Sequence, residues 1–252
     1  MAKTSGLGSS LIVGVYDISG DIGALSSIES RRATLDVSSI LTSATERITA
    51  LKDGSISFSS FWNTAADQAH LALSPQPRTD IQVTYLHGST VGEAAASMIA
   101  KQVNHQVARG QDGSLVAETQ AEANGYGLEI TGGDGSDGLL TTGAQSFATG
   151  TVSGTSIDYG STSTLFGAAA YLHVISVASG TATFAVQDSA NNTDFLDVTG
   201  LIFTGATGAT TERLQTGVTA TIRRYVRIQG TGVHGAAVIV CNFVRYLTNP
   251  SL

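Results

Sequence analysis

The sequence has few of the residues on which common functional classes depend. Its one cysteine, Cys241, excludes a disulfide within the chain, and it lies in the apolar run 236–244, where a buried, inert thiol is expected. Charged residues make up 13% of the chain, about half the usual share, so Ser, Thr, Gly, Asn and Ala must form much of the surface. Such a surface suits a protein covered by copies of itself, and equally an extracellular β domain rich in Ser and Thr.

Basic residues are scarce, because 13 Lys and Arg stand against 20 Asp and Glu, which gives a formal net charge of −7 at pH 7. This balance argues against binding to a nucleic-acid backbone, which needs a basic face. The N-terminus lacks the charged start and apolar core of a signal peptide, and no apolar window is long enough to cross a membrane. We therefore expect assembly in the cytoplasm and no membrane partner.

Arrangements typical of enzymes and of cofactor sites are missing. There is no nucleophile elbow and no phosphate-binding loop. The histidines are too far apart for close metal-ligand spacing: His70, His87, His105, His173 and His234. Of these, His105 and His173 lie in strand-like segments and are predicted to be paired within or beside a core. Asp17 and Asp21 fit turn chemistry better than acid–base catalysis. We therefore expect that the chain is not an enzyme and that it has no catalytic, cofactor-binding or metal-binding residue.

The segment 132–140, GGDGSDGLL, matches one calcium-binding β-roll nonapeptide. Such nonapeptides bind calcium when tandem copies stack and share ligands, and this chain has one copy. We interpret the segment as a linker that opens a region rich in Gly, Ser and Thr, residues 132–167. The boundary is placed near its start, so the two predicted domains are residues 1–135 and 136–252.

A short helix is predicted at about residues 45–52. Ser43 and Glu46 have the spacing of a capping box, in which the two residues satisfy each other's free backbone N–H groups. Ile48 and Leu51 then give a small apolar face, and a glycine follows as a stop.

The remaining signals predict strands, so the fold class is all-β: an antiparallel sandwich or barrel with one short helix, followed by a second β-sandwich. In the first domain the strand-like segments are 11–18, 32–37, 55–59, 79–87, 98–107 and 115–123. The alanines of 91–107 also fit a helical stripe, but the turn signal at 109–114 favours a hairpin. Within 79–87, Ile81, Val83 and Tyr85 share one face.

The second domain shows the same kind of pattern. Its strand-like segments are 156–159, 171–178, 181–187, 194–198, 221–229 and 236–245. Ser179 and Gly180 form a tight-turn signal, which predicts a hairpin between the second and third of these strands.

Arginines cluster in residues 223–227, RRYVR. Arg223 and Arg227 share one face of the predicted strand, and Arg224 breaks the alternation. Three arginines without supporting lysines form too small a footprint for nucleic acid. Because the planar guanidinium fork suits carboxylates, we predict that Arg223, Arg224 and Arg227 form ion pairs within or between subunits.

Short words along the chain resemble the major tail proteins, or tail tube proteins, of long-tailed (siphovirus-type) bacteriophages, particularly those infecting actinobacteria. In chain order they are YDISGDIG (16–23), LDV (35–37), ALKDGSISF (50–58), AKQVN (100–104), RGQDGSL (109–115), NGYGLE (124–129), AAYLHV (169–174), VQDSA (186–190) and RRYVR (223–227). Together they cover most of the chain in the expected order.

This resemblance implies a structural virion protein of the tail, which self-assembles into stacked rings through which DNA is delivered to the host. The implied partners are further copies of the chain and other tail proteins, namely the tape measure, tail terminator and distal tail proteins. DNA passes through the lumen without a dedicated binding site, and no catalytic residue carries over. The family commonly forms sixfold rings, and a threefold ring is plausible if each half contributes a wall sheet.

In such a ring, the sheet edges of one copy are completed by the next copy. Residues 1–10 and 61–77 are the candidates for contacts between rings. A wall that lets DNA pass should be acidic or neutral, and Glu118 and Glu122 are the predicted lumen-facing side chains.

Two other functions fit the residues. The second domain could be a carbohydrate-binding or host-adhesion module, with Tyr159, Tyr171 and Tyr225 as a sugar platform. The chain could also be a capsid decoration protein.

Overall fold

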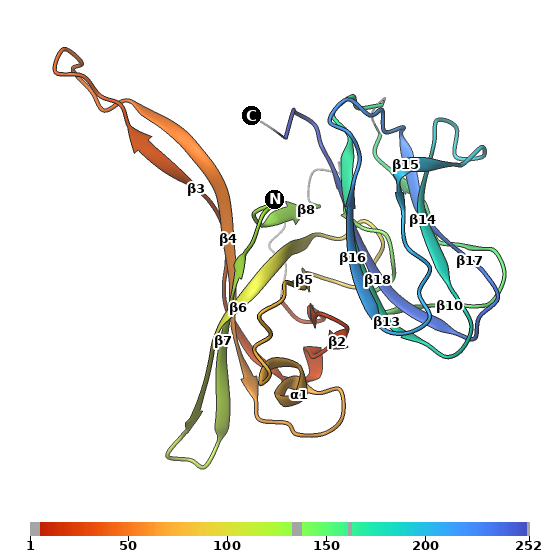
Figure 1. The fold of residues 1–252 in the computed structure, drawn as a ribbon, viewed down its shortest axis with the longest axis horizontal. Helices are drawn as coiled ribbons and strands as arrows, with labels where there is room; N and C mark the ends of the chain where they lie inside the picture. The colour runs from red at the N-terminus through yellow and green to blue at the C-terminus, as the bar shows by residue number, and fades with distance from the viewer. Residues whose placement is uncertain (1–5, 133–137, 161–162, 251–252) are drawn as a thin grey trace.

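The computed structural model describes residues 6–132, 138–160 and 163–250 and shows three β-sheets in successive layers (Figure 1). We call them the N-terminal sheet, the middle sheet and the far sheet. The predicted all-β class is confirmed. Most of the segment 132–140 lies outside the described residues, as do the first five residues of the candidate contact segment 1–10.

The N-terminal sheet has the strand order β2-β1-β5-β6-β7-β4-β3, and β8 also pairs with β6. Its strands are β1 Ser10–Val13, β2 Tyr16–Asp17, β3 Ile22–Asp36, β4 Arg47–Phe61, β5 Ile81–Leu86, β6 Ala95–Arg109, β7 Leu115–Ala123 and β8 Glu129–Thr131. The strand predicted at 98–107 and its hairpin with 115–123 are confirmed. Between the strands lie the short 3-10 helix η1 Ser19–Asp21 and the helix α1 Ala69–Leu73. In the described part of the chain, no helix has the length and apolar composition of a membrane span.

The N-terminal sheet curls around its own apolar core. Strands β1 and β4 are separated by three other strands, yet both contribute to a single buried cluster with α1, which requires the sheet to bend around it. As predicted, Ile81, Val83 and Tyr85 of β5 face this cluster. The buried carboxylate of Asp21 fixes α1 in place, because it accepts hydrogen bonds from Ala69 N (2.9 Å) and from a nearby asparagine amide.

The helix predicted at residues 45–52 is wrong, because residues 47–52 form the start of β4 and residues 45–46 lead into it. Glu46 does not close a capping box; its backbone N–H instead donates to Ser38 Oγ at 2.8 Å. Leu35 and Ile48 face each other across β3 and β4. An isolated helix of this length is marginal in water, so the cross-strand pairing of a sequence with β-branched residues prevails.

The middle and far sheets form the predicted C-terminal β-sandwich. The middle sheet has the order β10-β18-β13-β16 with β9 on β18, and the far sheet has the order β11-β17-β14-β15 with β12 on β17. The strands are β9 Gly138–Leu139, β10 Gln145–Phe147, β11 Val152–Ser153, β12 Ile157–Asp158, β13 Ala168–Val177, β14 Thr183–Ser189, β15 Leu196–Ile202, β16 Thr210–Gln215, β17 Tyr225–Thr231 and β18 Ala237–Arg245. The sequence signals do not predict β16.

The hairpin predicted around Ser179 and Gly180 is also wrong. Strand β13 belongs to the middle sheet and β14 to the far sheet, so the chain crosses between layers here. Gly180 has φ +74°, and a Cβ on it would lie 2.2 Å from the carbonyl oxygen of Val233. The glycine therefore allows a close approach of two backbones at the crossing, which a tight-turn signal does not distinguish from a hairpin.

Strand β13 is buried on both faces, because it lies in the central layer. Ala170, Leu172 and Val174 point into the sandwich core. Tyr171 and His173 are also fully buried and point the other way, toward the N-terminal sheet. The sandwich and the N-terminal sheet thus share the middle sheet as a wall (Figure 1).

Candidate assembly surfaces

One face of the N-terminal sheet is polar across four neighbouring strands. On β3, β4, β7 and β6, residues that pair across the sheet and point away from the apolar core form three rows: Ala24–Ser59–Glu118–Gln106, Ser27–Ser57–Gln120–Asn104 and Glu29–Ser55–Glu122–Lys101. No large apolar side chain occurs among these twelve positions. Since alternate residues of the same strands build the core, the strands have a clear inside and outside.

The charges on this polar face are mainly negative. Glu118 and Glu122 lie on it together, as their spacing of four residues along a strand requires. Glu29 adds a third carboxylate, and Lys101 supplies one ammonium group. That ammonium is paired with Asp80, which lies outside the rows, at 2.8 Å. The face is therefore acidic in balance, and a lumen-facing role for Glu118 and Glu122 stays a prediction.

The polar face ends at a free sheet edge. Strand β3 is the outermost strand, and within the described residues no other strand pairs with its outer side. Bulges interrupt its pairing with β4 near both ends, but the register is regular from Ser27 to Arg32. A regular, unpaired stretch of this kind offers its backbone N–H and C=O groups to another strand.

The C-terminal sandwich packs on residues that, like the polar rows, point away from the N-terminal core, but it lies across that core from them. The middle sheet contacts β1, β5 and the first half of β6, through a small apolar cluster that includes Ile12, Leu86 and Val240. In Figure 1 the strands of the polar face lie on the left of the N-terminal sheet and the sandwich on the right. The polar rows and the sandwich therefore lie on opposite sides of the N-terminal core.

A buried chain of hydrogen bonds joins the sandwich to the N-terminal sheet. His173 contacts Gly14 O through Nδ1 at 2.7 Å and Thr84 Oγ1 through Nε2 at 2.8 Å. Thr84 Oγ1 lies 2.8 Å from Ser97 Oγ, which accepts a hydrogen bond from Asn242 Nδ2 at 2.9 Å. All these side chains are buried, so each partner must be satisfied within the network.

Only one direction of donation satisfies this chain. Gly14 O can only accept, so Nδ1 of a neutral His173 carries the proton and Nε2 accepts from Thr84. Thr84 then accepts from Ser97, which accepts from Asn242. Burial lowers the pKa of His173 to about 4. If the ring were protonated, Nε2 would donate to Thr84, and Thr84 would then have to donate to Ser97. The Ser97 hydroxyl proton would have no acceptor in this network, because its other neighbour, the amide N–H₂ of Asn242, also donates.

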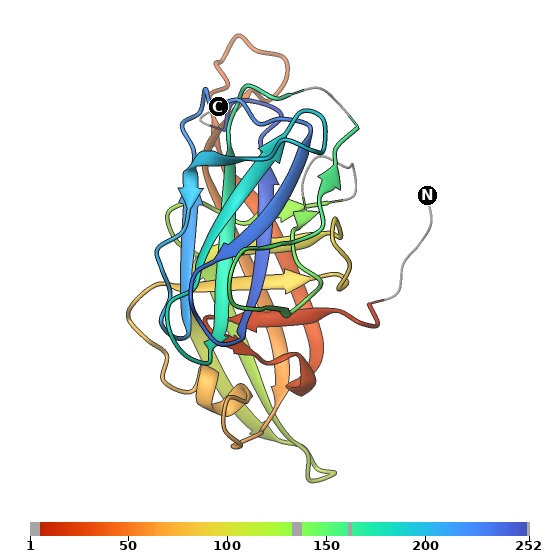
Figure 2. The same ribbon diagram turned by 90° about the vertical axis from the view of Figure 1, so that its right-hand side faces the viewer.

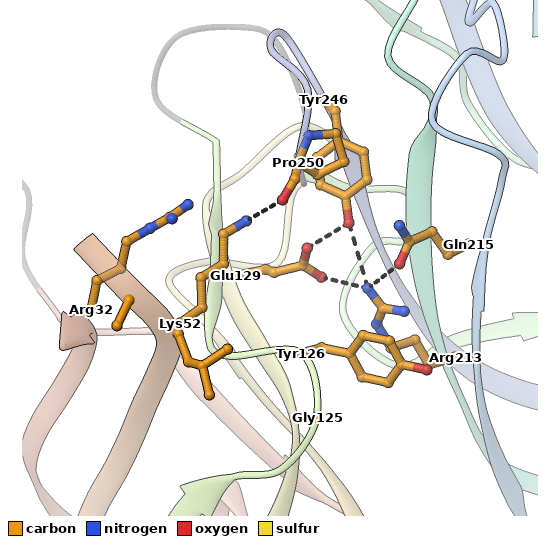
Figure 3. Close-up of a pocket in the computed structure, with 11 residues that line it drawn as sticks. Arg32, Lys52, Gly125, Tyr126, Glu129, Arg213, Gln215, Tyr246 and Pro250 are labelled. Carbon is orange, nitrogen blue, oxygen red and sulfur yellow. Dashed lines mark hydrogen bonds and ion pairs between the residues drawn. The ribbon is translucent and has the colours of Figure 1, made fainter. Parts of the chain in front are cut away.

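A second cluster lies beside a cleft of about 410 Å³ between β4 and the middle sheet (Figure 3). Glu129 of β8 accepts hydrogen bonds from Tyr246 Oη (2.6 Å), from Tyr171 Oη and from Arg213 Nη2 (3.2 Å). The Arg213 guanidinium also stacks on the ring of Tyr126, 3.8 Å from its centroid. Burial, reinforced by the Glu129 carboxylate, raises the pKa of both bonded tyrosines, so they remain donors. Because Glu129 belongs to the N-terminal sheet and Tyr171 and Arg213 belong to the middle sheet, the cluster acts as a junction between sheets.

The arginine cluster is paired within the chain. Arg223 forms a close ion pair with Asp188, whose carboxylate also accepts from Arg223 N at 2.8 Å. Arg224 pairs with Asp158 at 2.6 Å and lowers the pKa of that carboxyl to about 2. Ion pairs within the chain are thus confirmed for these two. Arg227 instead donates to the Gln187 side chain and stacks on a phenylalanine ring. A contact between subunits stays a prediction for all three.

Other predicted candidates are explained by packing. Tyr159 and Tyr171 are buried, so with Tyr225 they do not form the suggested sugar platform. His173 is core-bound as predicted, and His105 lies beside the core with Thr119. Within the described ranges, no group of three or more His, Cys, Asp or Glu side chains is placed to hold a metal ion. The His173 network was not predicted from the sequence. The pattern that indicates it is the pair of polar side chains at positions 171 and 173, on one face of an otherwise apolar strand.

No protein-family model matches the chain, and no curated protein matches it. Solved structures similar to it include a chain of the virion of a native gene transfer agent (GTA) particle, with TM-score 0.37 and 16% identity, over 52% of this chain and 99% of that chain. The SPP1 Dit (gp 19.1) protein, described as a hub adsorption apparatus protein, has TM-score 0.31 and 7% identity, over 93% and 98% of the two chains. A chain of the phage p2 baseplate has TM-score 0.34 and 8% identity, over 95% and 99%.

Proposed function

We propose that this chain is a structural subunit of a bacteriophage tail tube. In this proposal the polar face of the N-terminal sheet lines a lumen, and copies of the chain join side by side into rings. The rings stack with one another and end against other tail proteins, and DNA passes through the lumen. The ordered sequence words that resemble major tail proteins support the same function.

The three polar rows are the observation that carries the proposal. A sheet of an isolated globular domain can present a polar face to water, but this one combines that face with a long free edge strand. Joining β3 to a neighbouring copy would continue the polar rows from one subunit to the next and remove the open edge. The carboxylates on such a wall repel the phosphates of DNA. Its small and amide side chains carry no positive charge, so they do not bind phosphates by displacing counterions.

The arrangement also assigns a place to the sandwich. Because it lies across the N-terminal core from the polar rows, a lumen at the polar face puts the sandwich on the outside of the tube. Under this proposal one sheet of each copy forms the wall, which fits the sixfold ring better than the threefold alternative.

Charge reversal on the polar face tests the proposal. The variant carrying Glu118→Lys and Glu122→Lys should still form tails, because both side chains point away from the core, but it should deliver DNA poorly since the wall now attracts phosphates. The measurements are electron microscopy of particles and DNA release on exposure to host cells.

The matched control carries Asp194→Lys and Asp197→Lys, two exposed acids of the sandwich three residues apart, which give the same change in net charge. It should deliver DNA normally. Equal delivery by the two variants would remove the lumen assignment, and absence of the protein from tail shafts would refute the proposed function as a whole.

A further inference from the structure

The β3–β4 hairpin extends beyond the rest of its sheet as a two-stranded ribbon. Strand β7 pairs with β4 only from Ser55 to Phe61, so residues 31–53, which we call the ribbon, have no third strand. Figures 1 and 2 both show the ribbon projecting from one end of the molecule. Two-stranded ribbons are marginal in water unless they pack against another surface.

The ribbon carries large apolar side chains that the chain itself leaves exposed. They are Leu35, Val37, Ile40, Leu41, Ile48 and Leu51, and Ile40 and Leu41 at its tip are almost completely exposed. The ion pair between Arg31 and Asp53, 2.9 Å apart, joins the two strands at the base of the ribbon but does not cover these apolar side chains. Clustered exposed apolar side chains on a projecting element mark a contact surface.

A second apolar surface lies at the opposite end of the same sheet. Beyond Ala100, strand β6 has left β5, and the β6–β7 hairpin projects away from the ribbon (Figures 1 and 2). Val103, Val107 and Leu115 of this hairpin are exposed, and so is Phe61 of β4, which pairs with Val116 and points to the opposite face from Leu115. We call this surface the hairpin end. The 15 residues of β4 connect the two surfaces, a span of roughly 50 Å for an extended strand.

We propose that the ribbon of one copy docks on the hairpin end of a second copy, head to tail. A contact between two ribbons would leave both hairpin ends bare, whereas the ribbon-to-hairpin contact covers both apolar surfaces with a single interface. Because the two surfaces point in opposite directions, each added copy leaves one ribbon and one hairpin end free. The contact therefore propagates along an axis instead of closing into a dimer.

This inference rests on the proposed function in taking another copy as the partner, and it adds which two surfaces meet. It differs from the predicted ring contacts, which were residues 1–10 and 61–77. Its failure is distinguishable from that of the tube: a solid filament held by these surfaces would keep the contact and refute the lumen. Rings that form side by side but never stack would keep the proposed lumen and refute the ribbon-to-hairpin contact.

Two full-length variants test the contact. The tip variant carries Ile40→Asp and Leu41→Asp, and the hairpin variant carries Val103→Asp and Val107→Asp. Each is expected to stop at the monomer or the single ring at concentrations where the unmodified chain forms long polymers, as measured by sedimentation and electron microscopy. Mixed in equal amounts, they should form pairs of monomers or pairs of rings and stop, because one intact ribbon meets one intact hairpin end. The control carries Leu196→Asp and Val233→Asp, exposed positions on the sandwich, and should polymerise normally.

Stacked polymers from either variant, or no pairs in the mixture of two variants with normal melting temperatures, would overturn the proposal; so would an unmodified chain that never forms polymers longer than one ring. Cross-linking covers the case in which the hairpin variant fails to fold. The double variant Leu41→Cys with Val107→Cys should give a covalent ladder on oxidation, and Leu41→Cys alone should give monomers. Cys241 is buried, which raises its thiol pKa and keeps it out of the reaction. Dimers from Leu41→Cys alone would show ribbon-to-ribbon contact instead.

Discussion

The N-terminal sheet and the C-terminal sandwich are both antiparallel β structures, but they differ in how completely the chain finishes them. The sandwich encloses one large core that includes Phe147, Phe184 and Phe243, and the arginines of β17 and the preceding loop have partners within the chain. The N-terminal sheet has a smaller core, one open polar face, a free edge strand and two projecting hairpins. Their contact combines a small apolar cluster with the buried hydrogen-bond network around His173.

This difference separates folding from assembly within one polypeptide. Side chains of the sandwich pack against other residues of the same chain, so truncating them should lower the free energy of unfolding. Residues of the ribbon, the polar rows and the hairpin end contact little in the same chain, so changing them should alter assembly while leaving the monomer stable. The following three experiments on the monomer test that division.

The largest effect is expected from truncating a sandwich phenylalanine. Phe184 is fully buried and meets Phe147 edge to face, with ring centroids 5.6 Å apart, whereas Phe61 at the hairpin end is 53% exposed. Phe184→Ala should lower the free energy of unfolding by about 3–5 kcal/mol, because it leaves a cavity. Phe61→Ala should lower it by about 1 kcal/mol or less. Urea denaturation of both monomers checks this, and similar losses would contradict the division.

An acid-dependent loss is expected at the interface between the two regions. The folded protein keeps His173 neutral down to about pH 4, whereas the unfolded chain binds that proton near pH 6.5. The stabilisation is thus complete above pH 6.5 and is lost as the pH falls to about 4, to a total of roughly 3 kcal/mol. His173→Gln should be less stable at neutral pH but should lose less on acidification. Denaturation midpoints at several pH values measure the difference, and parallel curves would contradict it.

The smallest effect is expected from the exposed ion pair of the sandwich. Arg224→Ala removes a pair between two exposed side chains, and it should leave the melting temperature nearly unchanged because water and salt screen the interaction. Arg223→Ala strands the buried Asp188 carboxylate and should cost about 2–3 kcal/mol. Calorimetry of both variants compares them. A larger loss for Arg224→Ala would show that this pair has a structural role that its exposure does not indicate.

Sequence patterns predicted the elements whose burial alternates or whose residues are uniformly apolar. Segments 79–87, 115–123 and 236–245 show these patterns, and each forms a strand close to the predicted bounds. The shared face of Glu118 and Glu122 also follows from the period of a strand. Local spacing is enough to predict these strands because the alternation along a strand decides which face of the sheet each side chain occupies.

The patterns failed where distant residues decide the structure. Residues 45–52 pair with a strand that begins more than twenty residues earlier, so a local helix signal was overridden. The turn signal at Gly180 could not reveal that its flanking strands lie in different sheets. The His173 network joins side chains from residues 84 to 242, and such a junction becomes visible only once the two sheets are placed together.

The burial of β13 on both sides has a consequence for sequence variation. A typical sheet strand has one face where substitutions are tolerated. In Ala168–Val174, alternate residues instead pack in two different buried clusters. Saturation mutagenesis should therefore find this segment intolerant at consecutive positions, without the every-second-residue pattern expected of the strands that carry the polar rows.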